Sequence, residues 1–179
     1  MKFIGSGLSR RSFLYLIVIL YSAGVFIAGT AKISLADNIE PLCAKDIGVV
    51  SVKIAATGLG SILNKLKVEH ECIPLIRDFI DSVRFYADKS GYFYVYNYQC
   101  LNIAHATQKD LLGKNLYDYK DSRGKFVIRE LSATAQKGGG FVEYYWVKPG
   151  EKGEQKKLGY VEPIPGTDYF IGTGIYLGE

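Results

Sequence analysis

Tyrosine recurs at every second position over residues 92–98, a spacing that places four phenols on one face of a strand. The stretch 141–148 alternates in the same way. Phenols and indoles carry hydrogen-bond donors on rigid, largely apolar bodies, so such faces can line a pocket for a small molecule. Aromatic side chains also favour strands through packing alone. We expect at least two of four aromatic residues to line a cavity: Tyr94, Tyr96, Tyr144 and Trp146.

Two basic side chains lie close to the tyrosine strand in sequence, one near the end of the preceding helix and one in the following strand. The guanidinium of Arg84 offers a planar fork that can bind both oxygens of a carboxylate, although an arginine at a helix end is as often solvated. The imidazole of His105 either bonds to backbone at a strand end or donates to an acidic ligand. A charged donor would lose affinity as the pH rises through its pKa. Together with the aromatic residues, these side chains predict a site for a small carboxylate.

The periodicity of the chain changes from helical to strand-like near residue 90. Apolar residues at helical spacing predict helices, and period-two alternation predicts strands. The helices are expected over 37–67, 71–86 and 126–136, and the strands over 92–98, 103–106, 141–148, 156–164 and 169–176. Helices packed on a five-stranded antiparallel sheet make an α+β fold. Two glycines inside the last strand, Gly172 and Gly174, indicate a bulge or a group that approaches closely.

The N-terminus has the organisation of an export signal. Basic residues, including Arg10 and Arg11, precede an uncharged apolar run over 13–29, and Ala36 suits the last position before a cleavage site. The arginine pair favours the twin-arginine route, with an ordinary secretory signal as the alternative. We expect residues 1–36 to be removed and the protein to be periplasmic or extracellular. If the signal is not cleaved, the apolar run anchors the protein in a membrane.

The composition of the chain argues against nucleic-acid binding and against a metal site. The basic residues of the first 36 positions account for the net charge of +4, so the rest of the chain is near neutral and no nucleic-acid-binding face is indicated. No two of the three cysteines have the spacing of a zinc or thioredoxin site, so we predict no metal site. Cys43 and Cys72 lie at opposite ends of a predicted helix, so we prefer a disulfide between Cys72 and Cys100.

Six stretches, taken together in their order and spacing, resemble the Cache domain in its single-module form: "SGYFYVYN", "IAHA", "GKNLYDYKD", "IRELSATAQKGGGFVEYYWVKPG", "KLGYVEP" and "FIGTGIY". The resemblance implies an extracytoplasmic sensor with a PAS-like sheet, a long N-terminal helix, a pocket for a small organic acid, no cofactor and no catalysis. It divides the exported chain into a helical segment, 37–71, and the domain itself, 72–179. The family usually has an acidic residue and a glycine where Asn97 and Cys100 stand, and a proline where Ala106 stands.

The resemblance also implies that another protein relays the signal, such as a membrane receptor or a sensor kinase. A homodimer through the N-terminal helix is an open alternative. The rival hypothesis is a cofactor-loaded redox protein that is exported folded, but His70 and His105 are the only imidazoles and no haem-attachment motif is present. The "GxSxG" signature of hydrolases is also absent, so we predict no catalytic residues.

Overall fold

The computed structural model describes residues 35–66 and 69–178. The predicted export signal lies outside these residues, except for its last two positions, and stays a prediction. Within the described ranges the chain forms three α-helices, one 3-10 helix and five strands. Their bounds are α2 (Leu35–Leu63), α3 (Glu69–Asp81), β1 (Tyr94–Asn97), β2 (Asn102–His105), η2 (Lys109–Leu111), α4 (Val127–Gln136), β3 (Gly140–Val147), β4 (Glu154–Pro163) and β5 (Tyr169–Tyr176).

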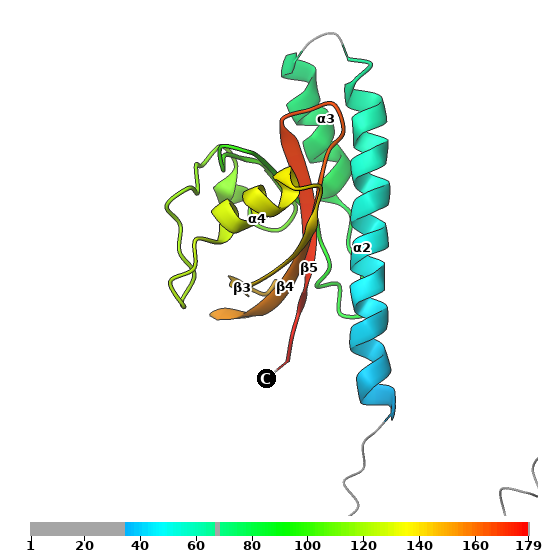
Figure 1. Ribbon diagram of the computed structural model, residues 1–179, viewed down its shortest axis with the longest axis vertical. Helices are drawn as coiled ribbons and strands as arrows, with labels where there is room; N and C mark the ends of the chain where they lie inside the picture. The colour runs from blue at the N-terminus through cyan, green and yellow to red at the C-terminus, as the bar shows by residue number, and fades with distance from the viewer. Residues whose placement is uncertain (1–34, 67–68, 179) are drawn as a thin grey trace, which may run out of the picture. The chain divides into compact units, whose positions relative to one another are not determined.

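The five strands form one antiparallel sheet in the order β2-β1-β5-β4-β3. Figure 1 shows α4 on one face of this sheet and α2 and α3 on the other. The predicted α+β fold, helices on a five-stranded antiparallel sheet, is therefore confirmed. Pairing of β1 with β5 brings the tyrosine strand beside the glycine-containing strand, with Tyr94 opposite Gly172. This pairing brings together two segments that lie more than 70 residues apart in sequence.

Helix α2 is apolar on two sides. Its inner side contributes buried residues to the core at helical spacing: Val52, Ala55, Ala56, Leu59 and Leu63. Its outer side exposes a second apolar stripe, defined by Ile47, Val50, Ile54 and Ile62, with Ile54 68% exposed. Within the described part of the chain, Ala44–Leu63 is the one helical stretch that is long and apolar enough to cross a membrane by length and composition. The same length and composition are also found in helices that pack in the core of a folded domain. The inner side of this stretch does pack in the core.

The pairing of β1 with β2 contains a bulge that decides which side chains share a face. Tyr94 pairs with His105 and Tyr96 pairs with Asn102, so Ile103 is the extra residue of β2. Without the bulge, residues three apart on a strand would point to opposite faces. With it, His105 and Asn102 lie on the same face as the tyrosines. The carbonyl oxygen of Ile103 accepts a 2.9 Å hydrogen bond from Nε of Arg77 on α3, which stabilises the irregular backbone.

Candidate functional site

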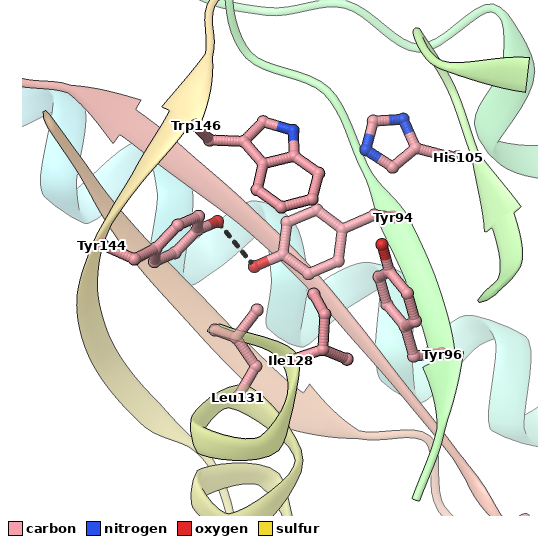
Figure 2. Close-up of a pocket in the computed structure, with 7 residues that line it drawn as sticks. All are labelled: Tyr94, Tyr96, His105, Ile128, Leu131, Tyr144 and Trp146. Atoms are coloured by element: carbon pink, nitrogen blue, oxygen red, sulfur yellow. Dashed lines mark hydrogen bonds between the residues drawn. The ribbon is translucent and has the colours of Figure 1, made fainter. Parts of the chain in front are cut away.

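A cavity lies between the tyrosine-bearing face of the sheet and α4 (Figure 2). Strands β1, β2 and β3 supply five aromatic or imidazole side chains, and two apolar side chains of α4 complete the wall. The lining residues are Tyr94, Tyr96, His105, Ile128, Leu131, Tyr144 and Trp146. Five of them are residues that the sequence predicts for ligand binding. Each of these five side chains is at most 6% exposed, so the cavity is shielded from bulk water.

The cavity is closed in this conformation. The free space at its centre is about 10 Å³, which is room for about one water molecule. The hydroxyl oxygens of Tyr94 and Tyr144 lie 3.3 Å apart across it (Figure 2). The Tyr94 hydroxyl also donates to the carbonyl oxygen of Thr173 at 3.4 Å. A ligand as large as acetate therefore needs these two phenols to move apart.

Glycines on β4 and β5 form the floor on which the phenols lie. A Cβ atom on Gly172 would lie 2.7 Å from ring atoms of Tyr94, and one on Gly159 would lie 2.6 Å from Cε1 of Tyr144. A Cβ atom on Gly174 would meet Cε of Lys157 at 2.6 Å. The prediction that Gly172 and Gly174 mark a close approach is therefore confirmed. Larger residues at these positions would leave no room for aromatic rings against the sheet.

Lys157 is the cation beside this cavity, and the sequence predictions missed it. It is the register partner of Tyr144 and is fully buried, with 0% exposure. Its Nζ donates to the hydroxyl oxygen of Tyr92 at 2.9 Å and to that of Tyr176 at 3.3 Å. Among the described residues no carboxylate lies within ion-pair distance of it. Burial without a counter-charge lowers the pKa of Lys157 well below its ordinary value.

The sequence did contain a signal for Lys157, namely its place in the alternation of residues along β4. On β4, Lys157, Gly159 and Val161 alternate with the residues of the opposite face and are all buried on the tyrosine-bearing face, so the lysine occupies an inward position. Lysine is almost never fully buried unless it is paired. A lysine at an inward position of an otherwise apolar strand pattern was therefore a candidate for a buried cation.

His105 is neutral, and its hydrogen bonds fix which nitrogen carries the proton. The backbone N–H of Gln108 donates to Nδ1 of His105 at 3.0 Å, and the N–H of Thr107 reaches the same atom at 3.4 Å. Because backbone amides only donate, Nδ1 is unprotonated and Nε2 carries the hydrogen. Burial, together with the nearby charge of Lys157, lowers the pKa of His105 to about 3. Of the two roles considered from the sequence, the structure shows the bond to backbone, made through Nδ1, and the role as a ligand donor stays a prediction.

Two predicted residues take other roles. The indole Nε1–H of Trp146 donates to Oε1 of Gln108 at 2.7 Å, so Trp146 lines the cavity with its ring alone. Arg84 is not among the residues that line the cavity, and its predicted contact with the ligand stays a prediction. Its guanidinium donates to three backbone carbonyl oxygens near the end of α3 and the end of β2, those of Asp81, Val83 and Ala106. Cationic side chains favour the carbonyls at helix ends, and this attraction explains the position of Arg84.

The predicted disulfide between Cys72 and Cys100 is not present in the structure. Cys100 is a buried free thiol in the β1–β2 turn, with a positive φ of 66°. Burial raises the pKa of the Cys100 thiol, with the charge of Arg129 acting against it, whereas Cys72 belongs to α3 on the face of the sheet opposite α4. The two thiols therefore belong to different layers. Within the ranges that the structure describes, no three His, Cys, Asp or Glu side chains are grouped closely enough to hold a metal ion.

Comparisons with known proteins identify relatives for most of this chain. The sequence profile of the family described as the Cache domain matches residues 50–179. The sensor histidine kinase MctS of Rhizobium johnstonii is 42% identical over 91 residues, 51% of this chain and 20% of that protein. The methyl-accepting chemotaxis protein McpP of Pseudomonas putida is 29% identical over 93 residues, 51% of this chain and 17% of that protein. The aligned region thus spans about a fifth of the length of these curated relatives.

Solved structures share the fold. The structure of a methyl-accepting chemotaxis protein from Vibrio parahaemolyticus has a TM-score of 0.68 and 34% identity, covering 79% of this chain and 95% of that one. A second structure, described as the structural basis for carboxylic acid recognition by a Cache chemosensory domain, has a TM-score of 0.69 and 24% identity. It covers 81% of this chain and 99% of the other. At 24% identity, the similarity to this second structure shows a shared fold and nothing more.

Proposed function

Because this chain belongs to the Cache domain family, as a single sensor module, we propose that it binds a small organic carboxylate outside the cytoplasm and acts without catalysis. The observation that carries the proposal is the buried ammonium group of Lys157 beside a cavity of phenols. Its only hydrogen-bond acceptors among the described residues are two neutral hydroxyls. A carboxylate supplies the missing negative charge.

Electrostatics favours an anion over a neutral ligand at this place. An isolated ammonium group is strongly disfavoured in a low-dielectric interior, and an opposite charge within a few ångströms restores its charged form. The surrounding donors also suit an acceptor-only ligand. Phenols of Tyr92, Tyr94 and Tyr144 and the Nε2–H of His105 can all donate, and an ionised carboxylate accepts through both oxygens.

Ligand entry requires the cavity to open, and the contacts that close it are weak. The oxygen–oxygen distance of 3.3 Å between Tyr94 and Tyr144 is longer than the usual 2.5–3.0 Å for hydroxyl hydrogen bonds. Carboxylate oxygens would replace this long contact with shorter, charge-assisted ones. A solved Cache chemosensory domain with the same fold is described as recognising carboxylic acids, and our proposal extends that ligand class to this chain.

We further propose that a membrane receptor or a sensor kinase relays the bound state. This proposal is supported by the relatives, which are a sensor histidine kinase and chemotaxis receptors. The exposed apolar stripe of α2 (Ile47, Val50, Ile54 and Ile62) suits a homodimer, because pairing with a second copy would remove these side chains from water. Export places the protein in the periplasm or outside the cell, free or held by residues 13–29.

The test is a calorimetric titration of acetate, propionate and pyruvate into wild type and two lysine variants. Lys157→Met keeps the length and apolar stem of the side chain but removes the charge. Lys156→Met is the matched control, because the neighbouring Lys156 turns to solvent and pairs with Glu143 at 2.9 Å. We expect at least one acid to bind wild type and Lys156→Met, and none to bind Lys157→Met. Equal binding to all three proteins, or binding to none, would contradict the proposal.

A further inference from the structure

One segment beside the closed cavity is held in place mainly by polar contacts. This segment, residues 117–126, leads from the β2 side of the sheet to the start of α4, and we call it the flap. Asp121 is the one buried residue of the flap, and the half-buried Tyr119 is its one apolar contact with the core. Among the described residues no backbone–backbone hydrogen bond joins the flap to a strand, whereas residues 113 and 114, just before it, make such bonds with Asn102 of β2.

The carboxylate of Glu154, at the start of β4, makes two hydrogen bonds with the flap. The hydroxyl of Tyr119 donates to Oε1 of Glu154 at 2.6 Å, and the backbone N–H of Ser122 donates to Oε2 at 2.7 Å. Both bonds span more than 30 residues of sequence, so they fix the flap to the sheet rather than to itself. Water can replace such bonds when the flap leaves the sheet, so their net contribution to closure is modest.

The flap also crosses the edge strand β3 through two polar contacts. The backbone N–H of Tyr145 donates to Oδ2 of Asp121 at 3.0 Å, and Nζ of Lys125 donates to the carbonyl oxygen of Glu143 at 2.6 Å. Strand β3 is the last strand of the sheet, so its outer edge is open to such contacts. The flap therefore lies against the side of the sheet that carries two cavity-lining residues.

Those two residues are Trp146 and Tyr144, and both lie next to the flap (Figure 2). The ring of Tyr119 packs edge-to-face on the indole of Trp146, with 5.1 Å between the ring centroids. A surface hollow of about 340 Å³ lies between the flap and β3, and Tyr144 lines both this hollow and the closed cavity. Release of the flap would uncover Trp146 and give Tyr144 space to move away from Tyr94.

The helix α4 also covers the cavity, but its displacement would cost more. Its residues Val127, Ile128, Leu131 and Ala135 are at most 2% exposed and belong to the core. Moving the helix would expose this apolar surface to water, which is unfavourable in proportion to the area. Segments with few buried apolar contacts open at lower free energy than the core. We infer that the flap gates the cavity and that the carboxylate of Glu154 holds it closed.

This gate is a property of the unliganded chain, and only the nature of the molecule that passes it rests on the proposed function. Trp146 is the single tryptophan of the sequence, so its indole N–H gives one NMR signal. That group donates to Gln108 at 2.7 Å and lies beside Tyr119. Its rate of hydrogen exchange with solvent therefore measures how often the flap opens, even when the open form is rare.

The exchange rate is compared among unliganded wild type, Tyr119→Phe and Glu154→Ala. Tyr117→Phe is the control for the phenol, because Tyr117 lies on the same flap and is 51% exposed. Glu151→Ala is the control for the carboxylate, because Glu151 lies in the same hairpin and pairs with Lys148 at 3.0 Å instead of with the flap. We expect exchange about tenfold faster in Tyr119→Phe and Glu154→Ala, the effect of losing a hydrogen bond to a charged group, and wild-type rates in both controls.

Two results of this measurement would overturn the inference. The first is an indole exchange rate that neither Tyr119→Phe nor Glu154→Ala changes, which would mean that another part of the fold opens the cavity. The second is an equal acceleration of the indole N–H and of the backbone N–H of Leu131 in α4, which would assign the exchange to unfolding of the whole domain.

Stopped-flow binding of propionate, followed by the fluorescence of Trp146, tests whether ligands pass the flap. Association and dissociation should both become about tenfold faster in Tyr119→Phe and Glu154→Ala. The dissociation constant should stay nearly constant, because the same contacts close the free and the bound forms. An unchanged association rate would exclude the flap as the entry route. If propionate, acetate and pyruvate do not bind wild type, the proposed function fails, whereas the exchange measurement still decides whether the flap is the gate.

Discussion

Nζ of Lys157 lies 2.9 Å from the hydroxyl oxygen of Tyr92 and 4.1 Å from the centroid of the same ring, with no carboxylate beside it among the described residues. The tyrosine therefore contacts the ammonium through both its hydroxyl and its π face. Cation–π contact and a neutral acceptor offset only part of the lost hydration of a buried ammonium. In the unliganded protein the charged form of Lys157 is therefore disfavoured, and a nearby anion would stabilise it, with several measurable consequences.

Replacing Lys157 by methionine should stabilise the unliganded protein. Removal of an unpaired buried charge is expected to raise the free energy of unfolding by about 1 kcal/mol or more. The partner hydroxyls keep a contact, because Tyr92 and Tyr176 already lie 3.2 Å apart through their oxygens. Urea denaturation at neutral pH measures the change. A variant less stable than wild type would show that the ammonium is already well compensated in the free protein.

Stability should also rise with pH in wild type. The pKa of Lys157 is lowered in the folded state, so the unfolded chain binds more protons between the folded pKa and about 10.4. In that window this group makes the free energy of unfolding increase by up to ~1.4 kcal/mol per pH unit, and the effect ends above the unfolded pKa. Denaturation curves at several pH values should show the slope in wild type and a smaller slope in Lys157→Met. Identical slopes would exclude this residue as their source.

Binding of a carboxylate should be coupled to proton uptake. The ligand raises the pKa of Lys157 from its lowered value, so affinity falls as the pH rises above the free-state pKa. His105 does not contribute near neutral pH, because its pKa of about 3 keeps it neutral there. Calorimetry in two buffers of different ionisation enthalpy counts the protons. Equal apparent enthalpies in both buffers across the pH range would refute the coupling.

Gly172→Ala should damage the site through its floor. The new Cβ would lie 2.7 Å from the Tyr94 ring, so the ring must move, and overpacking of this kind costs about 1–3 kcal/mol. We expect a lower melting temperature and weaker acid binding. Gly58→Ala on α2 is the control, because its Cβ meets no atom within 4 Å, and it should stabilise the helix by up to about 1 kcal/mol. If Gly172→Ala changed neither the melting temperature nor acid binding, Tyr94 would be free to shift.

Ile54→Glu should separate a homodimer without unfolding the domain. Ile54 is 68% exposed in the single chain, so a charge there disturbs little of the core, whereas in a helix pair it would be buried. Sedimentation equilibrium compares wild type, Ile54→Glu and the control Lys114→Glu, which changes an exposed residue far along the chain. We expect only Ile54→Glu to become monomeric. A wild type that is monomeric at all concentrations would remove the role proposed for the stripe.

Much of this architecture could be predicted from the sequence because its determinants are local. Period two placed Tyr94 and Tyr96 on one face, and alternation on β3 did the same for Tyr144 and Trp146. The glycines of β5 correctly indicated a close approach. The family match begins at residue 50, whereas the sequence resemblance placed the domain at 72–179, so part of α2 lies within the matched region. That helix is held by long-range packing, which local patterns do not report.

The missed features depend on contacts between distant segments. Arg84 was predicted to bind the ligand because a guanidinium suits a carboxylate, but three of its five N–H groups donate to the carbonyl oxygens of Asp81, Val83 and Ala106. No role was predicted for Lys157, and the pairing of β4 with β3 and β5 encloses it. Asn102 reaches the tyrosine face through a bulge that has no signature in a single sequence. In each case the position of neighbouring strands decided the role of the side chain.

The most direct test is a crystal structure of the protein grown with saturating propionate. We predict that Tyr94 and Tyr144 separate and that a carboxylate oxygen lies within ion-pair distance, 4 Å or less, of Nζ of Lys157. An acid bound at Arg84 or elsewhere on the surface, with the two phenols still in contact and Lys157 still unpaired, would contradict it.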